Sequence, residues 1–295
     1  MITRTPGWRA SRLLHLLVFV LLLVLGLAAC QRARAPDAPA EIVDLSHAYA
    51  ADTIYWPTEA GFQLEVVSAG PTDAGYYYAA NRFRSAEHGG THIDAPIHFA
   101  EGRWTVDEIP LERLRGPGVR IDVRTACETD RDHQIPVAAL EAWEAAHGRI
   151  ERGSIVLLDT GFARHWPDRV RYLGTDARGP EAVAALHFPG LHPEAARWLV
   201  EEREIHAVGL DTASIDYGRS TGFETHRALF AANVPAFENL TNLSALPARG
   251  FEVIALPMKI AGGSGAPLRA IALLPAPDGA RTRRDGGDPV GSRQP

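Results

Sequence analysis

The sequence is short of cysteine, with only Cys30 and Cys127 in 295 residues. Because Cys30 lies in a processing signal described below, Cys127 has no partner, and no internal disulfide can stabilise the fold. We expect Cys127 to be a buried hydrophobic residue and not a nucleophile. Basic charge is also scarce, with 30 Lys and Arg against 36 Asp and Glu, which argues against nucleic acid as a partner. No internal repeat is apparent. Because disulfide cross-links are excluded, the domain must rely on an ordinary hydrophobic core.

The N-terminus lacks an apolar run of full membrane-spanning length. Three arginines precede an apolar run from residue 13 to residue 25, shorter than the ~20 residues of a spanning helix. Leu27-Ala28-Ala29-Cys30 follows, with small residues where a signal peptidase cuts. The pattern resembles a bacterial lipoprotein signal, in which Cys30 becomes the lipidated first residue; an uncleaved anchor is the alternative. Both place the domain in the periplasm or at the cell surface, touching the membrane only through this anchor.

Four segments follow from composition. Residues 1–29 are the predicted signal peptide, and residues 30–40, rich in Arg, Ala and Pro, are a flexible tether. Residues 276–295 consist of Gly, Pro, Arg and Asp without periodicity, which predicts a disordered tail. Residues 41–275 remain as one large domain.

The pattern of elements predicts an α/β domain with a mixed sheet, because strands dominate the first half and alternate with helices in the second. Val- and Ile-rich or alternating runs predict strands at Ile42–Ser46, Phe62–Val67, Tyr76–Arg84, Val119–Val123, Ile155–Asp159, His206–Leu210, Glu252–Leu256 and Leu268–Leu274. Helices are predicted at Val137–His147, Glu194–Glu202 and Thr225–Ala232. Asp159 and Asp211 end two of the strands, where a carboxylate either lines a ligand pocket or caps a turn.

The densest functional pattern lies between residues 88 and 98, where His88, His92, Asp94 and His98 fall within eleven positions. Two glycines and a proline argue against a helix there. From His92 onward polar and apolar residues alternate, so an extended segment would present the polar ones on one face. Imidazole and carboxylate suit zinc or manganese, and three protein ligands with an open position can hold a reactive water. The segment therefore predicts the core of a metallohydrolase.

Residues 85–99 closely resemble the signature of the metal-dependent cyclase family, which includes bacterial kynurenine formamidase and isatin hydrolase. Residues 226–230 and 233–240 look like the family's second motif, and residues 44–46, 209–216 and 257–260 also match. The resemblance spans roughly residues 41–275. It implies a swivelling β/β/α domain, usually a homodimer or homotetramer.

The resemblance also implies a ligand set. His88, His92 and Asp94 would hold a first ion, and Asp94 would bridge to a second ion held by His226 and Glu238. One or two ions per subunit, zinc or manganese, are therefore expected. Sequence does not choose between these numbers or metals.

The implied activity is hydrolysis of a C–N bond in an aryl formamide or cyclic amide by water that the ion activates. His98 would be the general acid/base, and Trp56 would contact the small aromatic substrate. If His98 were a ligand instead, Glu238 or Asp211 would have to carry the proton. The formamidases continue their tryptophan motif with Gly-Asp, whereas Pro57 follows here. The export signal also weakens that assignment, and the His-Gly-Gly-Thr segment is nearer the isatin hydrolase branch.

Three alternatives stay open at this point. A lactone or cyclic ester hydrolase of the same family would use the same site. A lipid-anchored metal-binding protein without catalysis would recruit His98 as a ligand. A serine hydrolase is suggested by the nucleophile-elbow pattern at residues 218–222, but Asp216-Tyr217 precedes it in place of a buried strand, and His226 follows in the wrong order.

Overall fold

A ring of seven strands is the centre of this computed structural model, which describes residues 41–275. Neighbours around the ring are β12 (Gly265–Leu274), β11 (Arg249–Pro257), β5 (Arg115–Asp122), β7 (Ile155–Asp159), β9 (Ala207–Leu210), β10 (Ala236–Glu238) and β4 (His92–Asp94). Strand β4 pairs with both β10 and β12, and so closes the ring. The pairs from β5 through β10 are parallel and the others antiparallel. The sheet is therefore a mixed barrel, with β1 (Glu41–Asp44) added outside β12.

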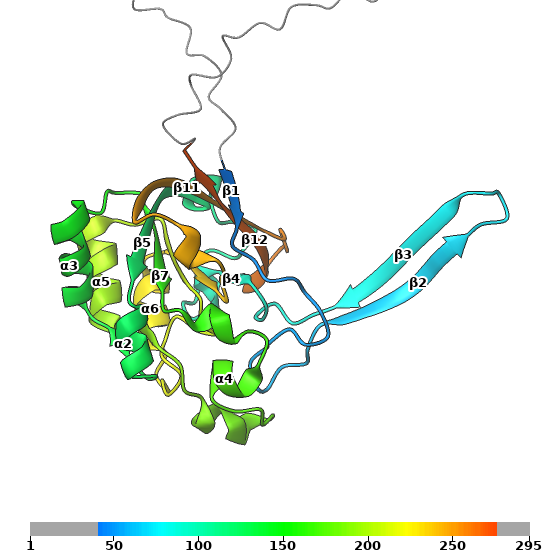
Figure 1. Ribbon diagram of the computed structural model, residues 1–295, viewed down its shortest axis with the longest axis horizontal. Coiled ribbons are helices and arrows are strands. Elements are labelled where there is room, and N and C mark those ends of the chain that lie inside the picture. The colour runs from blue at the N-terminus through cyan, green and yellow to red at the C-terminus, as the bar shows by residue number, and fades with distance from the viewer. Residues whose placement is uncertain (1–40, 276–295) are drawn as a thin grey trace, which may run out of the picture. The chain divides into compact units, whose positions relative to one another are not determined.

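Helices cover one side of this barrel (Figure 1). The helices are α2 (Arg124–Thr129), α3 (Val137–His147), α4 (Arg169–Leu173), α5 (Pro193–Arg203) and α6 (Glu224–Ala231). Helix α5 packs against both α3 and α6. Short 3₁₀ turns join the elements at Pro96–His98, Leu111–Arg113, Phe162–His165, Pro180–Ala185 and Leu243–Ala245. The short strands β6 (Gln134–Ile135) and β8 (Gly190–Leu191) form a separate parallel pair.

The core is divided in two by the sheet, because successive strand residues point to opposite faces. On β7, Val156 and Leu158 join the cluster beneath the helices, whereas Ile155 and Leu157 join the cluster on the other face. That second cluster includes small side chains from β11 and β12, which suit the inside of a narrow ring. Ile93 of β4 also belongs to it. Its neighbours on β4 therefore point outward, toward the helices.

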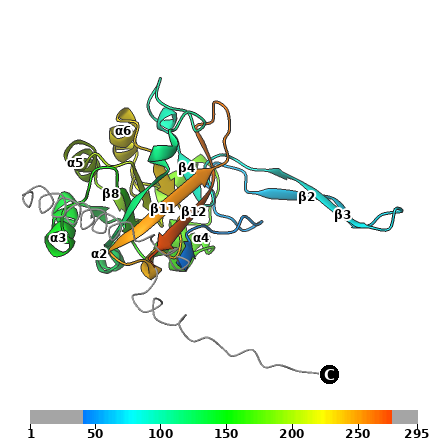
Figure 2. The same ribbon diagram turned by 90° about the horizontal axis from the view of Figure 1, so that it is seen from above.

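One pair of strands leaves the barrel. Strands β2 (Gln63–Pro71) and β3 (Tyr77–Arg84) form an antiparallel hairpin that projects from the body in both ribbon views (Figures 1 and 2). Nearly all of its residues are exposed.

The predicted α/β class and mixed sheet are confirmed, but the closed barrel was not predicted. The eight predicted strands and three predicted helices are all present with ends shifted by at most a few residues. Strand β10 was missed because its three residues are too few to show an alternation, whereas β4 lies in the segment that was predicted to be extended. The predicted signal, lipidated Cys30, tether and tail lie outside the described residues. Among residues 41–275, no helix is both long and apolar enough to cross a membrane.

A partly buried ion pair between α3 and α5 generates a stability prediction. Glu144 binds Arg203 through two hydrogen bonds of 2.7 and 2.8 Å and also accepts the Ile150 N–H at 2.7 Å. Removing its charge would leave the guanidinium without its partner, so we expect Glu144→Gln to lower the free energy of unfolding by about 2 kcal/mol at pH 7. Urea denaturation measures the change, with exposed Glu141→Gln on the same helix as control.

The pH dependence of this loss has a definite sign. Hydrogen bonds from Arg203 hold the pKa of Glu144 below its ordinary value of 4.5. The stabilisation is therefore complete above that value and is lost as the pH falls through the lower, folded-state pKa. The difference in stability between the variant and the parent should begin to shrink below about pH 4.5 and should disappear once the pH is below the folded-state pKa. A gap that stays constant with pH would show that the charge is not the cause.

Candidate metal centre

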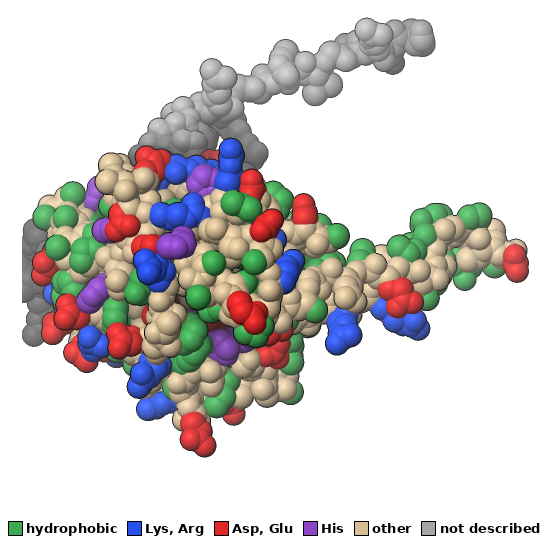
Figure 3. All heavy atoms as spheres, turned by 90° about the horizontal axis from the view of Figure 1, so that it is seen from below, with side chains coloured by type: hydrophobic (Ala, Val, Ile, Leu, Met, Phe, Trp, Pro, Cys, Tyr) green, Lys and Arg blue, Asp and Glu red, His purple; other side chains and the backbone are tan. Residues whose placement is uncertain are grey.

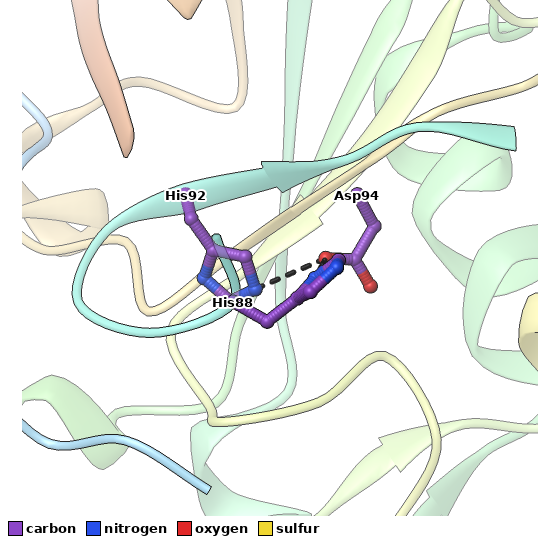
Figure 4. A group of neighbouring side chains, drawn as sticks. All are labelled: His88, His92 and Asp94. Carbon is purple, nitrogen blue, oxygen red and sulfur yellow. Dashed lines mark hydrogen bonds and ion pairs between the residues drawn. The ribbon is translucent and has the colours of Figure 1, made fainter. Parts of the chain in front are cut away.

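Four separate segments bring five side chains together on the outer face of the barrel. His92 and Asp94 point the same way from β4, and Glu238 on β10 lies directly opposite His92 in the antiparallel register. Residues paired in this way share a face of the sheet. His226 comes from α6, and His88 comes from the loop before β4. Figure 4 shows His88 folded back so that its ring meets the carboxylate of Asp94.

Two glycines let this loop turn back. A Cβ on Gly89 would come within 2.1 Å of the Tyr55 ring, and Gly90 has a φ of 59° with the Tyr49 ring 2.7 Å from its Cβ position. The hydroxyl of Tyr49 lies 2.9 Å from the Gly89 carbonyl and 2.6 Å from the Thr91 carbonyl. Only glycine fits the space at either position. The loop therefore holds His88 against β4.

The two carboxylates face all three imidazoles. Asp94 Oδ1 lies 2.7 Å from His88 Nδ1 and 3.0 Å from His92 Nε2, and its Oδ2 lies 3.1 Å from His226 Nε2. Glu238 lies 3.5 Å from His92 Nε2 and 3.3 Å from His226 Nε2. Four of the five side chains are at most 4% exposed, and His88 is 23% exposed.

The outer ring nitrogen of each imidazole faces an oxygen outside this group. His92 Nδ1 donates to the Gly90 carbonyl at 3.0 Å, and His226 Nδ1 donates to Asp216 at 2.6 Å. Asp216 also accepts the backbone N–H of His226. These partners occupy the outer ring nitrogens. The nitrogens that face the carboxylates are therefore the positions at which either a proton or a cation is held, and the carboxylates raise the pKa of His92 and His226.

His88 is held in the same way by a short chain of hydrogen bonds. The Ser264 hydroxyl donates to Glu87 at 2.7 Å, so its oxygen accepts from His88 Nε2 at 2.9 Å. His88 Nδ1 is left free to face Asp94. An outer oxygen that fixes the tautomer of a histidine is the usual companion of a metal-bound imidazole.

The donor set fits a divalent cation. The inner imidazole nitrogens lie about 3 Å from carboxylate oxygens, an arrangement that needs a positive charge between them, supplied by a proton or by a metal cation. His92 Nε2 is buried and makes no hydrogen bond of good geometry to any residue in the described range 41–275, although Asp94 is 3.0 Å away. Two overlapping groups, one of His88, His92 and Asp94 and one of Asp94, His226 and Glu238, each keep their ligand atoms within 4.8 Å of one another. Asp94 is common to both.

The charges within the site also shift its pKa values. Burial alone would lower the pKa of His92, but the nearby carboxylates of Asp94 and Glu238 outweigh it and raise that pKa. Burial, reinforced by the negative charge of Asp94, raises the pKa of Glu238. A proton and a metal cation therefore compete for the same lone pairs.

His98 lies beside the ligand group and not in it. Its ring stacks on His88, with centroids 3.8 Å apart, and makes no hydrogen bond to another of the described residues. Burial lowers the pKa of His98 to about 4, against the opposing effect of Asp94. The neutral imidazole is thus the form expected near pH 7.

A cavity of about 540 Å³ opens over these residues, a size typical of small-molecule sites. Its polar floor contains the five side chains and His98, and its apolar walls include Trp56, Phe99 and Phe223. Trp56 packs edge-on against Phe188. The arrangement offers a flat apolar space next to a charged floor, which suits a small aromatic molecule with a polar group.

Of the two carboxylates expected either to line a pocket or to cap a turn, Asp211 caps a turn and Asp159 forms an ion pair. Asp159 pairs with Arg120 at 3.0 Å. Asp211 accepts from the Thr160 backbone and hydroxyl, and its burial raises its pKa to about 6. Neither lines the cavity.

The nucleophile alternatives find no support in the geometry. Ser220 accepts the Phe223 N–H and lies outside the cavity, in a turn that follows no strand directly. Cys127 is buried, as expected, and burial raises its thiol pKa to about 12.

Sequence reasoning gave no role to Asp216, Glu87 or Ser264. Asp216 falls in one of the supporting matches, so its neighbourhood carried a signal. Ser264 lies 176 residues from His88. No local pattern could have joined those two.

Known proteins are similar to this chain in sequence and in fold. Isatin hydrolase of Roseibium aggregatum is 34% identical over 209 residues, covering 68% of this chain and 77% of that protein. Kynurenine formamidase of Salinibacter ruber is 29% identical over 237 residues, covering 80% and 99%. A crystal structure of an isatin hydrolase bound to the product analogue thioisatinate superposes with a TM-score of 0.72 and 29% identity, covering 86% of this chain and 98% of that one.

The model of the family described as Putative cyclase matches residues 43–217. That match covers more than half of the chain, including the loop and strand that carry His88, His92 and Asp94. The chain therefore belongs to the Putative cyclase family, as a homologue of isatin hydrolase and kynurenine formamidase.

Proposed function

We propose that the protein is a metal-dependent hydrolase that cleaves the C–N bond of a small aromatic amide, with an isatin-like cyclic amide as the preferred substrate class. The observation that carries the proposal is the convergence of three imidazole nitrogens with two carboxylates on the floor of an aromatic-walled cavity. Identity to a curated isatin hydrolase, 34%, exceeds that to the formamidase, 29%, and supports the cyclic substrate.

The ligands we propose are His88, His92 and Asp94 for one ion, with Asp94, His226 and Glu238 available for a second. Zinc and manganese both accept this mixture of nitrogen and oxygen donors. A divalent ion in such a site lowers the pKa of a water molecule toward 7 and polarises a carbonyl group.

Proton transfer falls to His98 in this proposal. Its ring borders the cavity, belongs to neither ligand group, and is neutral near pH 7. As a water oxygen bonds to the amide carbonyl carbon, the free ring nitrogen accepts the proton of that water. When the C–N bond breaks, the same imidazolium donates the proton to the departing nitrogen. One proton is taken up and one released, so the residue returns to its starting state.

The apolar walls orient the substrate. The rings of Trp56, Phe99 and Phe223 leave room for a flat aromatic group, which would direct the carbonyl toward the charged floor. A lactone or cyclic ester could occupy the same space, so the family's ester hydrolases are the second candidate. Export and lipid anchoring at Cys30, in the periplasm or at the cell surface, are a separate proposal resting on the sequence of residues 1–30.

The first prediction concerns metal dependence and substrate. The purified protein should contain zinc or manganese by elemental analysis and should hydrolyse isatin faster than N-formylkynurenine or simple lactones. Chelation should abolish turnover, and either ion should restore it, because the lone pairs need a cation between them. Activity that survives chelation but is blocked by a serine-directed phosphonate would instead favour Ser220 as a nucleophile.

A second prediction separates catalysis from metal storage. His98→Ala should keep its metal content and lower kcat by about 10²- to 10⁴-fold, the usual worth of a general acid/base. His88→Ala, which removes the ring on which His98 stacks and one proposed ligand, should lose metal as well as activity. Elemental analysis beside steady-state kinetics measures both. Loss of metal in His98→Ala would identify His98 as a ligand and contradict its role in proton transfer.

A third prediction concerns Asp216, which accepts the outer N–H of His226. Asp216→Asn should weaken metal binding by about 10- to 100-fold, because the amide no longer fixes the ring and its tautomer. Competition with a chromophoric chelator gives the affinity. Asp132→Asn is the matched control, since Asp132 pairs with His187 in the same way at 2.8 Å but away from the cavity. Equal affinities in the two variants would remove the orienting role.

A further inference from the structure

The outer partner of His92 differs in kind from those of the other two imidazoles. His226 and His88 each meet a side-chain oxygen, whereas His92 Nδ1 donates to the backbone carbonyl of Gly90 at 3.0 Å. Gly90 has a φ of 59°, and glycine is the residue with the greatest backbone freedom. A carbonyl in such a loop orients a ring only if another group holds it in place.

The side chain of Asn239 holds this carbonyl. Its amide Nδ2 donates to the Gly90 oxygen at 2.8 Å, so that oxygen accepts two hydrogen bonds, one from the amide and one from His92. Asn239 and His92 are each 2% exposed, which keeps bulk water away from the carbonyl. The Gly90 peptide therefore connects the amide of Asn239 to the ring of His92.

The backbone at Asn239 explains how the amide reaches this side of the sheet. Glu238 is the last residue of β10, and neighbours in a strand point to opposite faces. An extended residue 239 would therefore turn into the barrel, as Phe237 does. Asn239 instead has a φ of 54°, and its side chain lines the same cavity as Glu238. Asparagine is one of the few residues that adopt this left-handed conformation at small cost.

A buried tyrosine on α4 selects the direction in which the amide faces. The hydroxyl of Tyr172 lies 2.8 Å from Asn239 Oδ1 and 3.1 Å from the Asp211 carbonyl, and it donates to these oxygens. Tyr172 is completely buried. A reversed amide would set Oδ1 against the Gly90 carbonyl, where two acceptors would meet without a proton between them. The hydroxyl therefore stabilises the orientation in which the amide N–H points at Gly90.

We propose that Asn239 and Tyr172 are positioning residues of the metal centre, which hold the ring of His92 through the carbonyl of Gly90. Both polar atoms of the Asn239 amide already have partners within the protein, so this side chain is not free to bind substrate although it borders the cavity. The role rests on the metal site proposed above, but not on the identity of the substrate or on proton transfer by His98.

The same turn also places a second ligand. Glu238 and Asn239 are consecutive, so a displacement of this turn would move the carboxylate of one proposed ligand together with the support of another. The hydroxyl of Thr91 donates to the Asn239 carbonyl at 2.6 Å, and this bond joins the turn to the loop before β4 a second time. The spacing between Glu238 and His92 thus depends on groups at both ends of the Asn239 residue.

The surface adds little to the attraction of the site for a cation. Acidic and basic side chains are interspersed over the body, as Figure 3 shows for one face, so their fields largely cancel. Affinity for a cation therefore depends on how well the buried groups converge. A rotation of His92 that took Nε2 away from Asp94 and Glu238 would lower that affinity directly.

Cobalt(II) binding by the full chain tests the role, because the visible absorption of this ion reports the arrangement of its ligands. Asn239→Gly keeps the left-handed backbone, removes the amide and adds no charge. It should weaken cobalt(II) binding about 10-fold, at the lower end of the cost of losing an outer partner of a ligand. It should also shift the absorption bands of the loaded centre. Competition with a chromophoric chelator gives the affinity.

Asn242→Gly is the matched control. Asn242 has a φ of 57°, and its Nδ2 donates to the Asp44 carbonyl at 2.8 Å, but it is exposed and does not line the cavity. This substitution should leave the affinity and the bands unchanged. A merely structural role for Asn239 would lower the melting temperature of the metal-free chain without moving the bands.

Tyr172→Phe gives an independent measurement, since it leaves the Asn239 amide in place. Loss of one hydrogen bond should weaken cobalt(II) binding about 3-fold. The same change should have no further effect in Asn239→Gly, because both side chains act through one carbonyl. Additive losses would overturn the role of Tyr172. Affinity and bands equal to those of the parent in Asn239→Gly would overturn the proposal and leave the hydrolase proposal standing, whereas a parent chain that binds no cobalt(II) would overturn both.

Discussion

The outward donation of the imidazole N–H groups is the interaction on which the centre depends. The outer ring nitrogen of each histidine hydrogen-bonds to an oxygen outside the group. The partner is a loop carbonyl for His92, Asp216 for His226 and Ser264 for His88. The three acceptors belong to three different parts of the chain. A shift in any of them would let a ring rotate or change tautomer, and a donor N–H would then occupy the space that a cation needs.

The barrel contributes by register. Pairing of His92 with Glu238 sets an acid beside an imidazole, while Ile93 and Phe237 point into the ring and join its core. Because the same two strands supply ligands on one face and packing on the other, the ligand positions are set by a buried hydrophobic cluster. Helix α6 then adds His226 from above, and its own position is held by packing against α5 and by Asp216 at its start.

Local pattern predicted the part of the site that is local. His88, His92 and Asp94 fall within seven residues, and their alternation from His92 onward is visible without a structure. His226 and Glu238 came from the family resemblance alone, since nothing in their own segments singles them out. Glu87 and Ser264 act through a contact across 177 positions, which only the folded chain creates. Their roles could not have been derived from the sequence.

The fold shows the same division. Helix α3 was predicted with its observed ends because Pro136 and Gly148 bracket it. Ring closure was beyond reach, since it depends on two three-residue strands whose pairing is entirely long-range. Asp159 and Asp211 were ambiguous for a related reason. Side chains at strand ends line a binding site only where the topology leaves a cavity. Here the cavity lies over β4 and β10, and not over β7 and β9.

Strand β4 closes the barrel and also carries two of the proposed metal ligands. Barrel closure and metal binding are therefore linked equilibria. Three residues join β10 on one side and β12 on the other, while Asp94 and Glu238 place two negative charges across the seam between β4 and β10. A cation held by both carboxylates would offset their repulsion, and its binding free energy would add to the stability of the closed ring. In a cell short of metal, the pairing of β4 with β10 would be the first part of the ring to open, and the opened backbone would be accessible to proteases. Metal supply would then set how long the protein survives as well as how fast it works.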